Sequence, residues 1–213
     1  MFKLALIATC LALASANFAV VQMFKSVDIS VFECYVQKNV SLVASTVWDQ
    51  VGGAVDLFED SFTQAKTAGI PNYDAIIKIN DVSEPEDICG ETVHALPTDF
   101  NGTVWITFYT LWNRAIEERT DYLDSVIQTC QKHGLKMGIY SFQKQWMAVF
   151  NDMFATSETI ESLPLFYANH DQKASFDDFQ MSHFGKWTAP AMKEYVGTTW
   201  GFCYSAVNAQ VFF

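Results

Sequence analysis

Two groups of residues in this sequence lie at the ends of expected strands, where side chains can act on a ligand. Asp28 is near the end of a strand expected at residues 24–30, and His170 and Asp171 directly follow one expected at residues 163–169. Carboxylates in such places can serve as general acids or bases, or can hydrogen-bond the hydroxyl groups of a sugar. The alternative is that each caps a turn and touches no ligand.

The central stretch of the chain carries hydroxyl groups. Residues 102–109 begin at a glycine and contain mainly β-branched and aromatic residues, which predicts a buried strand. Thr107 and Tyr109 alternate along it, so both side chains point to one face. No Asp or Glu occurs from Asn101 to Arg114. If that face looks into an active site, this strand supplies it with no carboxylic acid.

Strand and helix patterns alternate along the part of the chain that must position these residues. Strands are expected at residues 40–48, 73–79, 102–109, 135–141 and 163–169, with shorter candidates at 191–196 and 203–209. Helices are expected at 56–68, 116–133 and 146–154, and a long polar loop is expected around Cys89. This alternation is typical of α/β folds with parallel strands.

We expect a single irregular TIM-like β/α barrel, with its functional face at the C-terminal strand ends. A doubly wound open sheet is the alternative. No GxGxxG or GxxxxGK[ST] follows any expected strand, so nothing indicates a nucleotide. No CxxC or Cys/His spacing indicates a zinc site. We therefore expect neither a cofactor nor a metal.

The N-terminus has the pattern of a secretory signal peptide. Lys3 precedes an apolar run over residues 4–13, too short to span a membrane, and Ala14-Ser15-Ala16 is a small-x-small cleavage site. We expect residues 1–16 to be removed, which takes the formal charge from −11 to −12. Residues 17–213 are expected to form one monomeric domain without a membrane span, secreted from the cell or into the endolysosomal lumen. So acidic a surface repels nucleic acid and anionic membranes.

The cysteines left after that cleavage are even in number, namely Cys34, Cys89, Cys130 and Cys203. In a secreted chain this suggests two disulfides, in one of three connectivities, with buried free thiols as the alternative. In a closed barrel the first and last strands are neighbours. Cys34–Cys203 is therefore one pairing to expect.

Several motifs occur together and in order along the chain. They are Val27-Asp28-Ile29-Ser30, Gly53-Ala54-Val55-Asp56, Gly138-Ile139-Tyr140-Ser141, Leu165-Phe166-Tyr167-Ala168-Asn169-His170-Asp171, and Phe184-Gly185-Lys186-Trp187-Thr188-Ala189-Pro190. The series resembles glycoside hydrolase family 25 lysozymes, in the secreted form found in protists and nematodes. The resemblance implies a distorted β/α barrel. It also implies an ancestral role in cutting the bond between muramic acid and glucosamine in peptidoglycan.

The chain departs from this family at the catalytic positions. The family's catalytic strand usually reads WLDxE, in which Glu is the general acid and Asp assists the substrate's acetamido group. Here the strand reads Trp105-Ile106-Thr107-Phe108-Tyr109. The resemblance thus puts Thr107 and Tyr109 in place of those acids, and Ala206 in place of the Asp of a closing VDxN motif. Asp28 alone matches the family's acidic residues.

Glycoside cleavage needs a carboxylic acid with a raised pKa and a second group for the oxocarbenium centre. A phenol, with a pKa of about 10, is a poor acid near neutral pH. We therefore expect a lysozyme-like protein with impaired catalysis and a groove for peptidoglycan or a chitin-like glycan. Candidate groove residues are Trp105, Tyr140, Tyr167, Asp171, Glu194 and Tyr195. Two alternatives remain: an active hydrolase that uses Asp28 with Asp171 or Glu194, and a secreted scaffold whose groove is filled.

Overall fold

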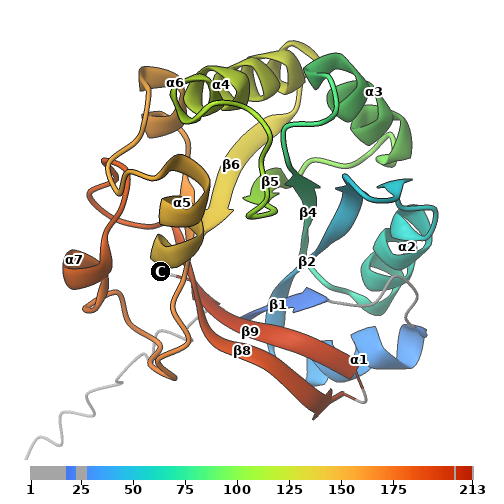
Figure 1. Ribbon diagram of the computed structural model, residues 1–213. Helices are drawn as coiled ribbons and strands as arrows, with labels where there is room; N and C mark the ends of the chain where they lie inside the picture. The colour runs from blue at the N-terminus through green and yellow to red at the C-terminus, as the bar shows by residue number, and fades with distance from the viewer. Residues whose placement is uncertain (1–17, 23–27, 204, 213) are drawn as a thin grey trace, which may run out of the picture.

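The structure is a computed structural model that describes residues 18–22, 28–203 and 205–212. One sheet curls into an irregular barrel, and helices cover its outside (Figure 1). Around the barrel run β1 (Phe18–Gln22), β2 (Val40–Asp49), β4 (Asn72–Ile79), β5 (Thr103–Phe108), β6 (Lys136–Ser141), β7 (Leu165–Ala168), β8 (Met192–Phe202) and β9 (Ser205–Phe212). The expected barrel is confirmed.

The barrel closes because β1 pairs with strands on both sides. It is parallel to β2 and antiparallel to β9, and β9 is also antiparallel to β8. From β2 through β8 each barrel strand runs parallel to the next. The short β3 (Gly53–Ala54) is an antiparallel addition to β2. The last two strands thus form a hairpin, which departs from the parallel order.

The helices follow the strands in turn. They are α1 (Ile29–Gln37), α2 (Phe58–Ala68), α3 (Pro85–Ala95), α4 (Ile116–Lys132), α5 (Gln143–Phe150), α6 (Glu158–Glu161) and α7 (Phe179–Ser182). The periodic segments at 56–68 and 116–133 are confirmed as α2 and α4. The helix α2 ends at Gly69, whose φ of 96° is in the left-handed region that glycine tolerates.

Two expectations are wrong. Residues 28–30, expected to end a strand, are the N-cap and first residues of α1, while residues 23–27 of that segment lie outside the described part of the chain. The expected polar loop around Cys89 is the helix α3. Its Pro85 stands in the first turn, where the missing N–H costs no hydrogen bond.

The alternation along β5 separates two apolar layers. Val104, Ile106 and Phe108 pack in the layer between the barrel and its helices. Trp105 points inward instead, into a smaller cluster within the barrel that includes Phe166. Inside, its indole N–H donates to Asp74 at 2.7 Å, and its ring meets the ring of Phe166 edge-on at 5.5 Å between centroids. The inward face of β5 therefore leads from a packed floor toward the C-terminal end of the barrel.

Two disulfides fasten the outer layer of the fold. Cys34–Cys203 joins α1 to the turn between β8 and β9, and Cys89–Cys130 joins α3 to α4. The expected pairing of Cys34 with Cys203 is confirmed, and it fixes the connectivity of the other two.

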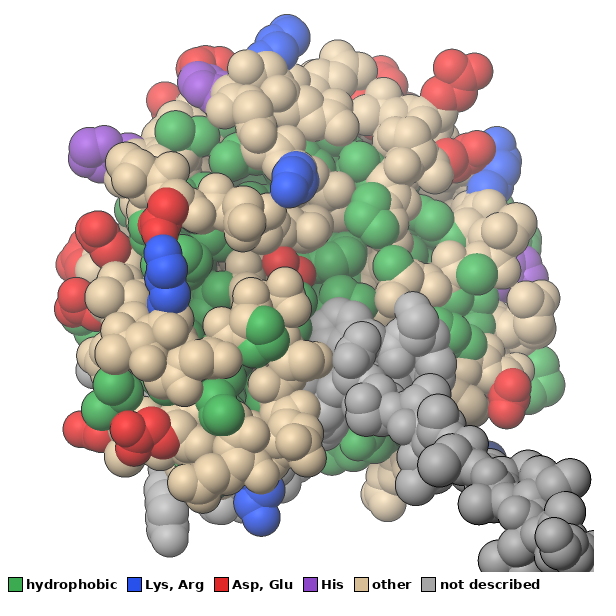
Figure 2. Space-filling model, turned by 180° about the vertical axis from the view of Figure 1, so that it is seen from behind, with side chains coloured by type: hydrophobic (Ala, Val, Ile, Leu, Met, Phe, Trp, Pro, Cys, Tyr) green, Lys and Arg blue, Asp and Glu red, His purple; other side chains and the backbone are tan. Residues whose placement is uncertain are grey.

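Acidic side chains lie mostly around the edge of the face shown in Figure 2, and apolar side chains gather toward its centre. Within the described residues, no helix is both long and apolar enough to cross a membrane.

Candidate functional site

A cavity of about 400 Å³ opens at the C-terminal ends of the barrel strands. Its apolar lining includes Val21, Ile76 and Ala168, close above the packed floor. Its polar lining comes from different strands and loops: Thr46, Asp49, Lys78, Thr107, Gln145, His170 and Glu194. We refer to this space as the mouth cavity. It occupies the place where β/α barrels carry their active sites.

Thr107 lies in this cavity, as its alternation in β5 predicts. The side-chain amide of Gln145 holds it in place. Its Nε2 donates to the carbonyl of Phe108 at 2.6 Å and, more weakly, to Thr107 Oγ1 at 3.4 Å. Ser141 in turn donates to Gln145 Oε1 at 2.9 Å. The hydroxyl of Thr107 thus belongs to a hydrogen-bond network with Gln145 and Ser141. The Thr107 side chain has no ionisable group.

Tyr109 is not among the residues that line this cavity, but it contacts two that are, Asp49 and Lys78. Its hydroxyl donates to both carboxylate oxygens of Asp49, at 2.8 and 2.9 Å. The ammonium of Lys78 lies over its ring, 4.0 Å from the centroid, as in a cation–π contact. Desolvation, then the hydrogen bond to Asp49, raises the pKa of Tyr109 to about 12. The phenol therefore keeps its proton throughout the physiological range.

Glu194 is a buried carboxylate on the opposite wall. Its residue surface is only 1% exposed, although it lines the cavity. His170 Nε2 lies 2.6 Å from its Oε1, and the Tyr140 hydroxyl donates to its Oε2. Tyr140 is itself stacked on Phe166 with ring centroids 4.3 Å apart. The hydrogen bond to Glu194 raises the pKa of His170, which favours the imidazolium form of the histidine.

Asp28 lies elsewhere. It is the exposed N-cap of α1, where its carboxylate accepts the backbone N–H of Ser30 at 2.9 Å. That backbone hydrogen bond lowers its pKa. Asp28 is not among the described residues that line the mouth cavity. Ala206 is in β9, but its side chain is outside the described part of the structure.

The six expected groove residues separate into distinct environments. Tyr140 and Glu194 line the mouth cavity. Trp105 is only 3% exposed and lies beneath the cavity as part of the floor. Asp171 is paired with the buried Lys193 at 3.0 Å. Tyr195 lies in β8, partly buried, and this burial raises its pKa.

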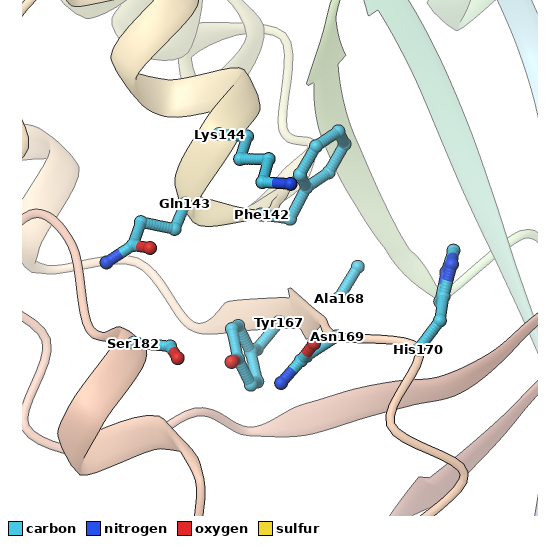
Figure 3. Close-up of a pocket in the computed structure, with 8 residues that line it drawn as sticks. All are labelled: Phe142, Gln143, Lys144, Tyr167, Ala168, Asn169, His170 and Ser182. Carbon is cyan, nitrogen blue, oxygen red and sulfur yellow. The ribbon is translucent and has the colours of Figure 1, made fainter.

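Tyr167, the last of the six, lines a second cavity of about 420 Å³ outside the barrel (Figure 3). Figure 3 shows this cavity between α5, the end of β7 and α7, with Ser182 at one side and His170 at the other. The two cavities share Phe142, Ala168 and His170. Phe142 is 41% exposed despite its large ring. Together the cavities make a continuous polar and aromatic surface.

Three important residues of the mouth cavity, Asp49, Lys78 and Gln145, were not expected from the sequence. The sequence does contain a feature that points to Lys78, because it is a charged residue near the end of the largely apolar strand β4. No set of three or more His, Cys, Asp or Glu among the described residues could hold a metal ion.

A family model described as Lys-1, lysozyme-like protein 1, matches residues 13–195. The chain belongs to this lysozyme-like family. It is 26% identical over 179 residues to counting factor 50 of Dictyostelium discoideum, covering 80% of this chain but 57% of that protein. It is 28% identical over 176 residues to the probable GH family 25 lysozyme 5 of the same organism, covering 78% of this chain and 77% of that one.

Solved structures carry the same fold. A family GH25 lysozyme from Aspergillus fumigatus superposes with a TM-score of 0.69 and 13% identity, over 92% of each chain. The lysozyme-like chain thus has a GH25-type barrel. The expected family is confirmed, and Thr107 lies on β5, the strand that the sequence resemblance identifies as catalytic, with Tyr109 directly after its end.

Proposed function

We propose that this lysozyme-like protein is secreted and binds a peptidoglycan or chitin-like glycan at the mouth cavity without cleaving it. One observation carries the proposal: the side chains at the two acidic positions of the resemblance are hydroxyls already engaged within the protein. Thr107 accepts from Gln145, and Tyr109 donates to Asp49. Neither supplies a carboxylic acid to a glycosidic oxygen.

The loss of rate expected without a positioned carboxylic acid supports the same proposal. Positioned general acid catalysis contributes about 10²–10⁴ in rate, and a group acts best as an acid when its pKa is near the working pH. With a pKa of about 12, Tyr109 is far from that condition. A threonine hydroxyl is a weaker acid still. Loss of the second carboxylate removes the group that would meet the developing positive charge.

An active hydrolase built on other acids is less well supported. Asp28 caps α1 and is exposed, and Asp171 is bound to Lys193. Glu194 does line the cavity, but both of its oxygens accept hydrogen bonds from the chain. With both oxygens already engaged, Glu194 has no oxygen free to carry a proton to a glycosidic oxygen.

A scaffold with a filled groove is also less well supported. The mouth cavity and its neighbour, at about 400 and 420 Å³, are both within the range of about 300–1,000 Å³ typical of ligand pockets. Exposed Phe142 offers a ring face where the two cavities meet. Aromatic rings beside amide and hydroxyl groups suit a sugar, which has both apolar and polar faces.

Secretion rests on the N-terminal pattern and is supported by the two disulfides, which are typical of oxidising compartments. Mass spectrometry of the protein from culture medium should show a mature start within a few residues of Asn17. An intact Met1 on a cytosolic pool would contradict this part of the proposal.

Two measurements test the function. Zymography on peptidoglycan, with an active GH25 lysozyme as positive control, should show no clearing by this protein. Saturation-transfer NMR with chitotriose should show contact with the wild type and weaker contact with Phe142→Ala. Phe154→Ala is the control, because Phe154 is also an exposed aromatic residue and does not line the mouth cavity. Clear turnover that Asp28→Asn abolishes would overturn the proposal.

A further inference from the structure

Lys78 lines the mouth cavity, and its ammonium has no ion-pair partner among the described residues. It enters from β4, where its neighbours across the sheet are Asp49 on β2 and Thr107 on β5. Its ammonium lies over the ring of Tyr109, 4.0 Å from the centroid, and forms no hydrogen bond or ion pair with the described part of the chain. Up to three N–H donors therefore remain for a ligand or solvent.

The carboxylates of the same cavity, by contrast, already accept hydrogen bonds from the protein. Asp49 accepts the hydroxyl of Tyr109 on both oxygens and the backbone N–H of Val51 on one. Glu194 accepts from His170 on one oxygen and from Tyr140 on the other. Both acids therefore have hydrogen-bond partners within the protein, whereas the ammonium of Lys78 keeps its donors open toward the cavity.

The formal charge of the whole molecule, −11, does not by itself decide whether an anion binds here. At physiological ionic strength, charges farther than about 8 Å are largely screened. An anion inside the cavity therefore interacts mainly with the groups that line it. Partial burial of Lys78 beside apolar Ile76 strengthens that interaction relative to bulk water.

We propose that the mouth cavity selects a saccharide bearing a free carboxylate, which pairs with the ammonium of Lys78. This inference rests on the proposed glycan-binding function and specifies the ligand's charge. The carboxylate can come from the lactyl group of a muramic acid without its peptide, or from a uronic acid. In both cases a charge-assisted hydrogen bond forms where a neutral sugar would offer only a hydroxyl.

Matched ligands separate charge from shape. By isothermal titration calorimetry, the wild type should bind N-acetylglucosaminyl-N-acetylmuramic acid about tenfold more tightly than the same disaccharide with a primary amide in place of the carboxylate, the weight of one charge-assisted hydrogen bond. A hyaluronan tetrasaccharide and its carboxyl-reduced form test the uronic acid source in the same way. A preference confined to one pair identifies the source.

Variants at position 78 test whether Lys78 causes the preference for the carboxylate over the amide. Lys78→Met should abolish it, and Lys78→Arg should retain it. Lys132→Met, which removes the charge of an exposed lysine at the end of α4, should leave it unchanged. Circular dichroism of each variant verifies its fold.

Each other outcome overturns the inference in a recognisable way. If acid and amide bind equally, the glycan-binding function survives and the role of Lys78 fails. A preference that persists in folded Lys78→Met also removes that role. If neither disaccharide, nor hyaluronan, nor chitotriose binds, the proposed function fails together with the inference.

Discussion

The hydroxyl of Tyr109 donates to both oxygens of Asp49, and so ties the end of β5 to the end of β2. These strands are not neighbours, because β4 runs between them. Tyr109 therefore spans the rim above Lys78, which lies against its ring. The residue that the sequence resemblance aligns with a catalytic acid is therefore a structural link between the two strand ends.

This link predicts a measurable loss of stability in Tyr109→Phe. A hydrogen bond to a charged group contributes about 1.5–3 kcal/mol, and partial solvent exposure at this site reduces the expected loss to about 1 kcal/mol. The free energy of unfolding in urea measures it. Tyr195→Phe is the matched control, because the Tyr195 hydroxyl makes no hydrogen bond within the described part of the chain, and it should change stability little. Equal losses in the two variants would contradict the link.

Packing at the barrel floor predicts that alanine substitutions at Gly138 and at Gly90 change stability in opposite directions. A Cβ on Gly138 would lie 2.4 Å from Cζ3 of Trp105, whose ring is held by Asp74 and Phe166. Gly138→Ala should therefore destabilise the protein by about 1–3 kcal/mol. Gly90, inside α3, has no atom within 4 Å of such a Cβ. Thermal unfolding should show that Gly90→Ala instead stabilises by about 0.5–1 kcal/mol. Loss of stability in both would mean that the contact with Trp105 is not the cause.

Much of the fold could be predicted because its elements follow local rules. The apolar runs of β2, β4 and β5 and the periodic pattern of α2 and α4 each define an element without help from distant residues. The helix α3 was missed because its residues are largely polar, although Pro85 followed by two acids is a helix-start signal. Asp28 was assigned to a strand end for a similar reason, since an Asp can cap a turn or a helix.

The site was only partly predictable, because its contacts join residues far apart in the chain. Alternation along β5 predicts that Thr107 points inward, but nothing local indicates that Tyr109 reaches Asp49, 60 residues away. Nor does the sequence show that Trp105 is part of the packed floor and not of a groove surface. Those outcomes depend on strand register and on how the barrel closes.

The pair of His170 and Glu194 predicts a pH-dependent contribution to stability. The pKa of His170 is raised in the folded protein above its ordinary value of about 6.5. Its contribution is therefore fully present below about pH 6.5 and is lost as pH rises through the folded-state pKa. The difference in melting temperature between wild type and His170→Gln should be larger at pH 5.5 than at pH 8.5.

Control variants make this test specific. His94→Gln removes an exposed histidine of α3 and should show no such change between the two pH values. Glu194→Gln should behave like His170→Gln, with a larger loss of melting temperature at pH 5.5 than at pH 8.5, because it removes the carboxylate that pairs with His170. A constant difference for His170→Gln across the range would show that its protonation does not matter to folding.

The disulfides predict a ranking that depends on the length of chain each one closes. Cys34 and Cys203 are separated by 169 residues, and Cys89 and Cys130 by 41. In the chain-entropy model these loops correspond to about 5 and about 4 kcal/mol of stabilisation. Replacing each pair by serines should lower the free energy of unfolding, with the larger loss for Cys34 and Cys203. The reverse order would show that burial of the Cys89–Cys130 bond outweighs loop length.

The last prediction concerns restoring hydrolysis. Thr107→Asp with Tyr109→Glu returns carboxylates to the two positions, yet Lys78 would remain beside residue 109. A nearby ammonium lowers the pKa of a carboxyl group and keeps it ionised, so the new Glu could not donate a proton. Removing that cation by Lys78→Met leaves Asp49 as the nearest charge. A like charge raises the pKa of the new Glu toward that of a general acid.

We therefore expect the triple variant Thr107→Asp, Tyr109→Glu, Lys78→Met to cleave peptidoglycan faster than the double variant, and the wild type to show no turnover. Release of reducing sugar measures the rates. The matched control places Gln at position 109 of the triple variant, which preserves shape and removes the acid, and should be inactive. If the double variant is as active as the triple variant, Lys78 does not govern the protonation of residue 109. If the Gln control is also active, the turnover comes from another group in the mouth cavity.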